Sequence, residues 1–493
     1  MTVPWLSIAI FTPLVGAVLT MLAGRRQIGR VVSLIASVVP LGIGAGVLAR
    51  TPGIDDFVLK ESIAWVSTDS LTITYTMALD GLSAPLFALT ALLVAAAILF
   101  SWEETKRPLS FFALLLVLET SVLGVFAALD LFVFYVFWEF VLIPMFFLIA
   151  IWGGAHRRYA ATKFFVYTFL ASLVMLLGFM GMYFGLPDGV PATFNFLELQ
   201  QYTAGFSVEL QILLFVALLV GFAVKMPVVP VHTWLPWAHV EAPTAGSVLL
   251  AGVLLKMGAY GLIRFAIGAF PFAAVKLAPL LLVIGIVSIL YAALVCLAQN
   301  DLKRMVAFSS ISHMGVAMLG IATLNEIGFM GAIYMLIAHG LLSPLAFMMC
   351  GSIQHGWGTR EIDKLGGIMQ KTPTMGTFTM AAFIGSLGFP GFAGFIAEIA
   401  VLVGTYQAFG WIVIFPLLGV VLTAGYYIWA IQRALHGELT AEHADSAHEM
   451  PFYETAAVGV LTFFAIVYGV WPALLTEHIN PFVEGLLSTV GVI

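Results

Sequence analysis

Residues 208–230 read VELQILLFVALLVGFAVKMPVVP, and residues 242–265 read APTAGSVLLAGVLLKMGAYGLIRF. Both stretches are apolar runs long enough to cross a bilayer, and each contains one buried lysine, Lys225 in the first and Lys256 in the second. A lysine at bilayer depth costs at least about 2.5 kcal/mol on insertion scales, so it requires a partner, water or a function. The prolines after Lys225 remove backbone donors and predict a helix break beside that charge. The two runs therefore predict a membrane protein that uses buried charge.

The composition of the whole chain agrees with this interpretation. Of the 493 residues, 61% are hydrophobic and only 9% are charged, whereas soluble domains have about 25% charged residues. Apolar runs of about 20 residues fill almost the entire sequence, and their hydrophobicity is continuous rather than alternating, which predicts helices and not a β-barrel. The fold class is therefore predicted to be an all-α polytopic membrane protein. No basic tract is dense enough to indicate a nucleic-acid partner.

We expect about fourteen transmembrane helices, and a short interfacial tail from Pro481. Their predicted ranges are 4–22, 28–48, 78–100, 109–127, 130–151, 162–184, 208–226, 243–267, 275–297, 302–322, 328–354, 374–404, 410–433 and 453–475. The segment GSLGFPGFAG predicts a second interrupted helix, with Glu398 directly after the break. Residues 51–76, between the second and third helices, are expected to form an acidic loop.

The two interrupted helices are five apart in order, which predicts a pair of inverted repeats. The expected organisation is three helices in residues 1–108, a first five-helix repeat in 109–270, a second in 271–435, and an inner loop, a last helix and a tail in 436–493.

The lysines and arginines predict the orientation of the chain. One side receives Arg25, Arg26, Arg30, Lys106, Arg107, Arg157, Arg158, Lys163, Lys303, Arg304, Arg360, Lys364, Lys371 and Arg433. The other side has Arg50, Lys60, Arg264 and Lys276. Because basic loops stay in the cytoplasm, we expect both termini on the outer side of the cell membrane.

Seven ionisable residues are expected at bilayer depth, each on a different helix. They are Glu119, Glu139, Lys225, Lys256, His313, His339 and Glu398. Buried carboxylates and lysines exchange protons near neutral pH when their surroundings change, as a proton relay requires. Glu139 lies in an aromatic run without another charge, so we expect it to pair with Lys225. Ser309, Ser312 and His313 share a helix face and are expected to hold a row of water molecules.

A structural alternative remains open for each of these residues, because polar contacts between membrane helices are common. The breaks beside Lys225 and Glu398 favour function for those two, while the role of Glu119 stays undecided. His232 and His239 are interpreted as loop-packing residues near the membrane edge. The histidines of the inner acidic segment are interpreted as part of a solvated linker rather than a metal site, and they are His436, His443 and His448. The chain carries no nucleotide-binding or hydrolase motif.

Four segments resemble one known family. They are DLFVFYVFWEFVLIPMFFLI (130–149), HTWLPWAHVEAPTAGSVLLAGVLLKMGAYGLIRF (232–265), DLKRMVAFSSISHMG (301–315) and AHG (338–340). Together they resemble the antiporter-like subunits of respiratory complex I, and among these the M type. Glu398 supports the M type, because the other two antiporter-like subunits and the related subunits of sodium/proton antiporters usually have lysine there.

This resemblance implies a membrane-arm subunit that translocates protons while partner subunits transfer electrons from NADH to quinone. Flavin, iron–sulfur clusters and quinone would belong to partner subunits, and two further antiporter-like subunits would be neighbours. The resemblance implies that Glu139 and Lys225 form a switching pair and that Lys256 is the central group. It further implies that His313 and His339 are connecting groups and that Glu398 is the terminal group.

The sequence also departs from the family pattern at three positions. Trp237 replaces a frequent aspartate, Phe308 a frequent tyrosine, and Pro344 lies in a part of its helix that is often free of proline. These departures are expected to change local geometry. Two other functions remain open, a subunit of a multisubunit sodium/proton antiporter and a non-conducting structural subunit of a membrane arm.

Overall fold

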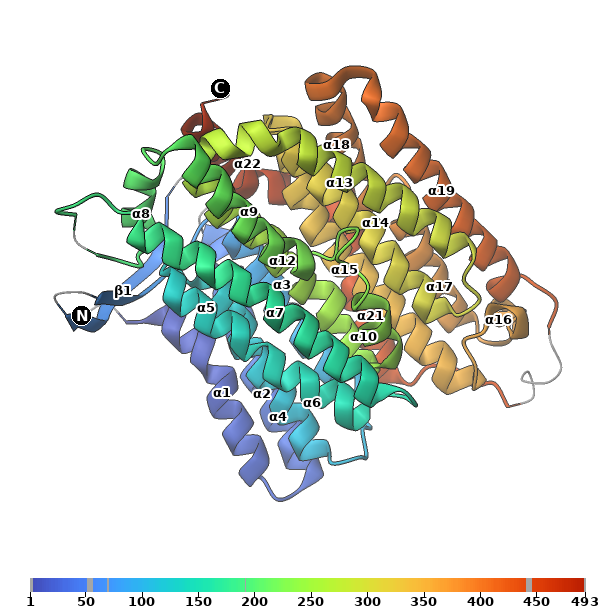
Figure 1. Ribbon diagram of the computed structural model, residues 1–493. Helices are drawn as coiled ribbons and strands as arrows, with labels where there is room; N and C mark the ends of the chain where they lie inside the picture. Colours follow the sequence, from blue (N-terminus) through green and yellow to red (C-terminus); the bar gives the residue numbers. More distant parts are fainter. Residues whose placement is uncertain (1–2, 51–55, 69–70, 191, 440–445, 492–493) are drawn as a thin grey trace.

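The computed structural model describes residues 3–50, 56–68, 71–190, 192–439 and 446–491, and it shows a bundle of long helices (Figure 1). Among these residues, 13 helical spans are long and apolar enough to cross a membrane. One of them, 393–435, contains two helices, α18 (Ala393–Phe409) and α19 (Ile414–Ala430), which are joined at Gly410 with φ +62°. Each predicted transmembrane range is therefore occupied by helix, and the predicted fold class is confirmed.

The first half of the chain contains ten of the labelled helices. They are α1 (Trp5–Leu22), α2 (Arg26–Arg50), α3 (Ser83–Phe100), α4 (Pro108–Ala127), α5 (Leu131–Phe140), α6 (Leu142–Trp152), α7 (Arg157–Phe184), α8 (Phe196–Thr203), α9 (Val208–Lys225) and α10 (Leu235–Glu241). The span that follows, 244–267, is built from α11 (Thr244–Leu249), a π-helical segment (Leu250–Leu254), α12 (Leu255–Gly261) and a second π-helical segment (Leu262–Ile267).

The second half continues with long helices. They are α13 (Pro271–Leu297), α14 (Leu302–Ala322), α15 (Glu326–Trp357), the short α16 (Ile368–Lys371), α17 (Pro373–Ser386), then α18 and α19, α21 (Phe452–Val470) and α22 (Ala473–Val490).

Both predicted helix breaks are present. α9 ends at Lys225, and helix resumes at Leu235 after turns that contain Pro227 and Pro230. α17 ends at Ser386 and α18 begins at Ala393, and the turn between them contains Gly388 at φ +79° and Gly391 at φ +102°. Glycine adopts these positive φ angles without the steric cost that a Cβ would bring. A third break, which was not predicted, separates α5 from α6 at Val141, two residues after Glu139.

The segment before α3 forms a β-hairpin rather than the predicted loop. β1 (Val58–Thr68) pairs antiparallel with β2 (Leu71–Leu79), and α3 begins at Ser83 instead of residue 78. The sequence LTITYT has the alternation and the β-branched residues of a strand, a signal that the acidic composition of the surrounding loop obscured. Residues 51–55 and 69–70 of the predicted loop lie outside the described residues.

Asp130 anchors this hairpin to the bundle. Its carboxylate caps α5 by accepting hydrogen bonds from the amides of Phe132 (3.0 Å) and Val133 (3.2 Å). It also accepts the amide of Thr74 at 2.8 Å. The position of the hairpin is therefore coupled to the start of the helix that carries Glu139.

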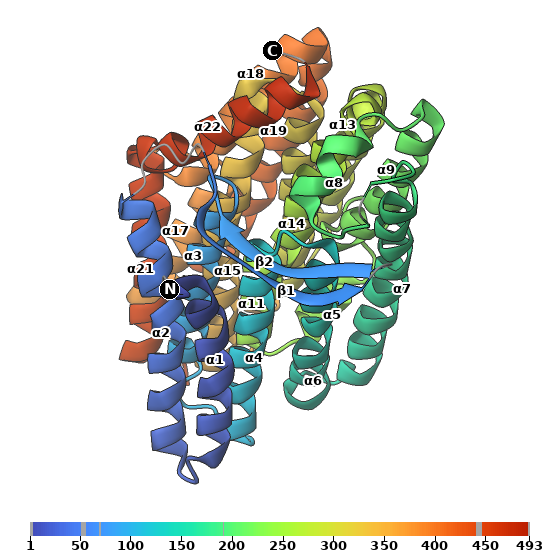
Figure 2. The same cartoon turned by 90° about the vertical axis from the view of Figure 1, so that its left-hand side faces the viewer.

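The C-terminal segment is a helix, α22, and not only a short tail after Pro481. In Figure 2 it runs obliquely across the end of the bundle, on the same side as the hairpin. It packs directly on the start of α3, because a Cβ on Gly81 would lie 2.0 Å from the carbonyl oxygen of His478. This contact covers one end of the helices at the centre of the bundle.

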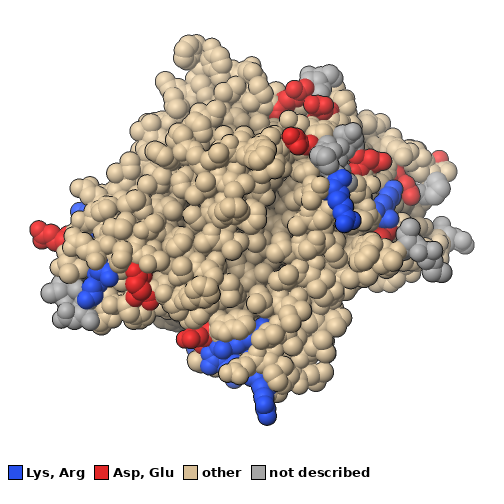
Figure 3. All heavy atoms as spheres, turned by 180° about the vertical axis from the view of Figure 1, so that it is seen from behind, with Lys and Arg blue, Asp and Glu red and all other residues tan. Residues whose placement is uncertain are grey.

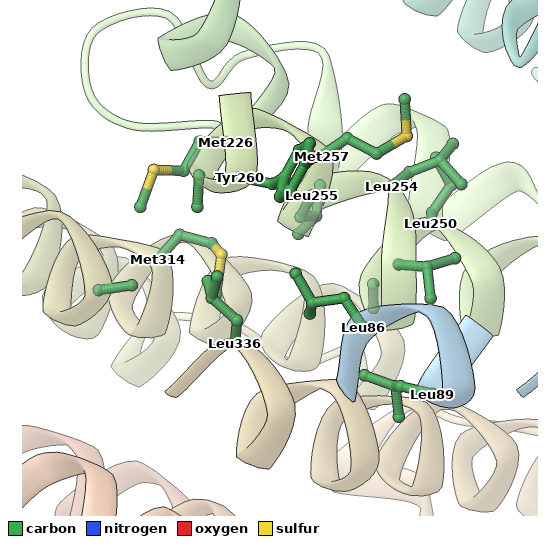
Figure 4. Packing of buried hydrophobic residues seen from close by; sticks show 14 of the residues in the cluster. Leu86, Leu89, Met226, Leu250, Leu254, Leu255, Met257, Tyr260, Met314 and Leu336 are labelled. Carbon is green, nitrogen blue, oxygen red and sulfur yellow. The ribbon is translucent and has the colours of Figure 1, made fainter. Parts of the chain in front are cut away.

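The centre of the bundle consists of the 244–267 span, α14 and α15, which are buried along their length. Figure 4 shows Leu250, Leu254 and Leu255 of the 244–267 span packed with Leu86 of α3 and Leu336 of α15. The surface shown in Figure 3 carries few charged side chains, and these gather near its margins. This face is therefore poor in charge, while Lys256, His313, His339 and Glu398 are buried in the interior.

Candidate functional site: buried ionisable residues at the centre of the bundle

Lys256 lies at the centre of the site, on α12 between the two π-helical segments. Its side chain is 0% exposed. The ammonium group donates to the carbonyl of Ala251, which belongs to the first π-helical segment, and lies 2.6 Å from Nδ1 of His339 on α15. π-helical turns are rare and occur frequently at functional sites. The structure thus places Lys256 among protein acceptors and away from lipid.

Two glycines allow this close contact between the 244–267 span and α15. A Cβ on Gly252 would lie 2.9 Å from Cγ of Pro344, and a Cβ on Gly340 would lie 3.2 Å from the carbonyl oxygen of Gly252. Because neither glycine has a Cβ, the two backbones approach closely one turn from Lys256 and one residue from His339. The hydrogen bond between Lys256 and His339 depends on this approach.

His339 and His313 are neighbours in the interior. Their rings lie 5.3 Å apart between centroids. His339 uses Nδ1 toward Lys256, while its Nε2 has no hydrogen-bond partner among the described residues. His313, on α14, places Nε2 3.0 Å from the carbonyl oxygen of Ser386 at the end of α17, and its Nδ1 is likewise unpartnered there. The free nitrogens leave both imidazoles able to bind or release a proton.

Glu398 completes the arrangement on α18. Its Oε1 lies 3.9 Å from Nε2 of His313, and its side chain is 8% exposed. A cavity of about 10 Å³ lies between Glu398, His313 and His339, close to the roughly 10–15 Å³ that holds one water molecule. Lys256, His339, His313 and Glu398, hereafter the relay residues, therefore form one series of neighbouring titratable groups, with room for one water between the last three.

Glu139 and Lys225 lie near each other but are not bonded. Among the described residues no ion pair or hydrogen bond joins them, although their charges interact. The Lys225 ammonium, 1% exposed as a residue, has no hydrogen-bond partner and lies 5.3 Å from the ring centroid of Trp138. Ser172 and Tyr135 interact with the Glu139 carboxyl. The predicted pair is therefore not formed in this structure, where the two residues are neighbours in an open arrangement.

Glu119 is separate from the relay residues. It lies on α4, is fully buried, and neither carboxylate oxygen has a hydrogen-bond partner among the described residues. The geometry assigns it no role in the site.

His239 occupies a different place from the one expected. It is 0% exposed, its ring stacks on Phe347 with centroids 4.5 Å apart, and neither ring nitrogen has a partner among the described residues. It interacts electrostatically with both Lys303 and Lys256. The surrounding sequence, which is rich in proline and tryptophan, predicted a position near the membrane edge for His239. The structure shows instead that α10 places this residue in the interior of the bundle. His232, in contrast, packs on Tyr291 in accordance with the prediction.

A large cavity opens beside Lys303, on the side of the bundle where the basic loops gather. Its volume is about 890 Å³, and its charged lining includes Glu103, Glu241, Glu454 and Lys303. Lys303 donates to the carbonyl of Ala242 at 2.6 Å. We call this space the inner cavity. It ends at Lys303, whose charge acts on His239, and His239 in turn faces Lys256.

The serines of α14 do not line a single row. Ser309 accepts a hydrogen bond from the Tyr427 hydroxyl at 2.9 Å, and Ser312 donates to the carbonyl of Ile289 at 3.3 Å. Neighbouring helices supply these partners, so the two hydroxyls are directed at different helices, and the row of water molecules beside His313 stays a prediction. His443 of the inner acidic segment lies outside the described residues, and within the described part of the chain no three His, Cys, Asp or Glu side chains are placed to hold a metal ion.

Comparisons with known proteins agree with one another. A family model described as NADH:quinone oxidoreductase/Mrp antiporter, TM, matches residues 128–423, which is more than half of the chain. Subunit M of the F(420)H(2) dehydrogenase of Methanosarcina mazei is 40% identical, over 98% of this chain and 98% of that protein. NADH-quinone oxidoreductase subunit M of Rhodobacter capsulatus is 38% identical, over 98% of this chain and 96% of that protein. A chain in the structure of respiratory complex I from Thermus thermophilus with bound NADH superposes with a TM-score of 0.88 at 29% identity, covering 99% of this chain and 100% of that one.

Proposed function

Because the chain belongs to the transmembrane family shared by NADH:quinone oxidoreductases and Mrp antiporters, as an M-type member, we propose that it is a proton-translocating membrane-arm subunit of a complex I-type NADH:quinone oxidoreductase. Flavin, iron–sulfur clusters and quinone belong to partner subunits, and two further antiporter-like subunits lie beside it in the membrane. The observation that supports this function is the series of relay residues that extends from Lys256 to Glu398.

Protons enter from the inner cavity and pass along buried side chains to the opposite side. Lys303 and His239 connect the inner cavity to Lys256. Lys256 donates to Nδ1 of His339, and an imidazole can accept a proton at one nitrogen and release one from the other. The released proton reaches His313, through the small water-sized cavity, and then Glu398. The turn between α17 and α18 beside Glu398 provides the outlet, since interrupted helices in membranes line polar paths.

Glu139 and Lys225 act as the switch. In the open arrangement the Lys225 charge is not neutralised by an ion pair, and it opposes a proton on Lys256 through electrostatic repulsion. Closing the pair neutralises Lys225 and allows Lys256 to be reprotonated. The two regions are mechanically connected, because a Cβ on Gly258 would lie only 2.6 Å from the backbone nitrogen of Met226, the residue after Lys225.

The electron donor is selected by partner subunits. M-type relatives occur in an F(420)H(2) dehydrogenase as well as in an NADH-quinone oxidoreductase. The relay residues would serve either complex, because their chemistry involves only protons. The basic loops face the cytoplasm, and the hairpin, α22 and both termini face the outside of the plasma or inner membrane.

The test uses the assembled complex in proteoliposomes, with Lys225→Ala and Glu139→Ala as variants. We expect both variants to assemble and to pump far fewer protons per electron, while Lys276→Ala, a lysine outside the site, pumps normally. Normal coupling in both switch variants would reject the proposed pair. Sodium-dependent exchange without quinone reduction would instead identify an antiporter subunit. Reduced assembly with an unchanged number of protons per assembled complex would identify a structural subunit.

A further inference from the structure

α15 contains a proline at its centre, five residues after His339. Pro344 is buried in this 32-residue helix. Proline has no backbone N–H, so the carbonyl of Gly340, four residues earlier, lacks its usual helical donor. A buried carbonyl without a donor costs free energy unless another group satisfies it.

The Gly340 carbonyl is directed at the first π-helical segment. It lies 3.6 Å from the position of a Cβ built on Gly252, and Pro344 Cγ lies 2.9 Å from the same position. Gly252 follows Ala251, whose carbonyl accepts the Lys256 ammonium, and Gly340 follows His339, which contacts that ammonium at 2.6 Å. The released carbonyl is therefore next to both partners of Lys256.

One N–H donor of the Lys256 ammonium has no assigned acceptor. An ammonium group carries three N–H donors and no acceptor, and the described structure assigns two partners, the Ala251 carbonyl and His339. A buried charged donor without an acceptor is costly.

We propose that Pro344 is a positioning residue of the relay, because it keeps the Gly340 carbonyl free as a third acceptor for the Lys256 ammonium. This carbonyl stabilises the protonated form of Lys256 and retains the ammonium while its contact with His339 opens and closes. The proposal rests on the proposed function. It depends on a residue at which this chain departs from the pattern of the family that it resembles.

Three titratable groups on the elements packed around the 244–267 span interact electrostatically with Lys256, and they are His239 of α10, His313 of α14 and His339 of α15. The packed elements also carry Lys225 on α9, Glu119 on α4 and Lys276 on α13, and Glu398 of α18 lies beside His313, whereas α3 and α6 carry no titratable side chain. None of these groups changes when Pro344 is replaced, so a changed pH dependence would report on Lys256 through the Gly340 carbonyl.

The test compares the pH dependence of proton pumping by assembled complexes that carry Pro344→Ala or Pro279→Ala. Alanine at 344 supplies an N–H that returns the Gly340 carbonyl to the helical hydrogen-bond pattern. We expect the alkaline limit of pumping to move to lower pH by about half a unit or more, since each unit corresponds to a 1.36 kcal/mol change between protonation states. Pro279 also lies inside a helix, α13, which carries none of the relay residues, so Pro279→Ala should leave the profile unchanged.

Pro344→Gly distinguishes the effect of restoring the backbone N–H from the effect of losing side-chain packing, because glycine also supplies the donor but fills less space. Equal shifts in the alanine and glycine variants support the proposal. A profile equal to that of the parent complex, or a shift confined to one of the two variants, overturns it. Lys256→Ala distinguishes this failure from failure of the proposed function: if that variant stops pumping while Pro344→Ala is unshifted, only the role of Pro344 is rejected.

Discussion

The carboxyl group of Glu398 lies against Gly388, where an added side chain would displace it. A Cβ on Gly388 would lie 2.2 Å from Oε2 of Glu398, and Gly388 has φ +79°. The backbone at this turn therefore determines where the last of the relay residues is held, and His313 can approach Glu398 only while this carboxyl stays in place.

Gly388→Ala should displace Glu398 and reduce proton pumping per electron at least several-fold in assembled complexes. Gly391→Ala is the matched control, because Gly391 has φ +102° but an added Cβ meets no atom within 4 Å. Both variants carry a backbone strain of about 1–2 kcal/mol. Pumping measured in liposomes should fall only for Gly388→Ala, and equal losses in both would assign the effect to strain.

His339 lies between Lys256 and His313 in the proposed relay, and no other side chain among the described residues forms a hydrogen bond with the Lys256 ammonium. His339→Ala should lower coupled pumping by about 100-fold, the lower range for loss of a positioned acid–base group. His232→Ala, which removes a buried histidine that packs on Tyr291, should pump normally. The measurement is the initial rate of proton uptake into vesicles, and an undiminished rate in His339→Ala would show that protons bypass this residue.

At the scale of elements, three helix breaks lie within a few residues of an ionisable side chain. α9 stops at Lys225, α5 stops just after Glu139, and α18 restarts shortly before Glu398. Breaks expose backbone groups and lower the cost of a nearby charge. The prolines and glycines made two of these breaks predictable. The break at Val141 is also followed by a proline, Pro144, which cannot donate to the carbonyl of Phe140, but the prediction of one helix over 130–151 did not use this mark.

Asp130 gives a test of how elements are held together. Asp130→Ala removes the cap of α5 and the hydrogen bonds to Thr74. We therefore expect the free energy of unfolding to fall by about 1–2 kcal/mol and the hairpin formed by β1 and β2 to be cleaved faster by protease. Ser207→Ala removes the cap of α9, whose Oγ accepts the amide of Leu210, and should leave the hairpin protected. Limited proteolysis of the assembled complex, followed by mass spectrometry, distinguishes the two. Equal protection of the hairpin in both variants would mean that other contacts hold it.

At the scale of the whole molecule, the two ends of the bundle differ. The inner cavity with Lys303 lies at one end, and the hairpin and α22 cover the other. At the covered end Arg264 pairs with Asp80 and lies 4.9 Å from the ring of Phe482 on α22. The asymmetry provides a wide opening on one side and a capped surface on the other.

Cysteine labelling tests the proposed orientation. In right-side-out membrane vesicles, Asp188→Cys in the exposed loop after α7 should react with an impermeant maleimide, and Arg25→Cys between α1 and α2 should react only after the vesicles are opened. The two native cysteines, Cys296 and Cys350, are buried and should give no background. The reverse pattern of labelling would invert the orientation.

The sequence by itself determined the membrane class, most of the helix ranges, the two main breaks and the seven ionisable residues that lie within apolar helices. These properties follow from local chemistry: a run of apolar residues must be helical in lipid, proline and glycine interrupt helices, and a charge inside an apolar run is unusual wherever the run lies.

Only the tertiary structure decided how those residues meet. The partners of Lys256, the interior position of His239, the open arrangement of Glu139 and Lys225, and the separate hydrogen bonds of Ser309 and Ser312 all depend on how distant helices approach. Residues such as Lys256 and His339 are 83 positions apart, and their 2.6 Å contact requires Gly252 and Gly340 to bring two backbones together. Contacts of this kind arise from packing between faces of different helices, which the periodicity of any one helix does not contain.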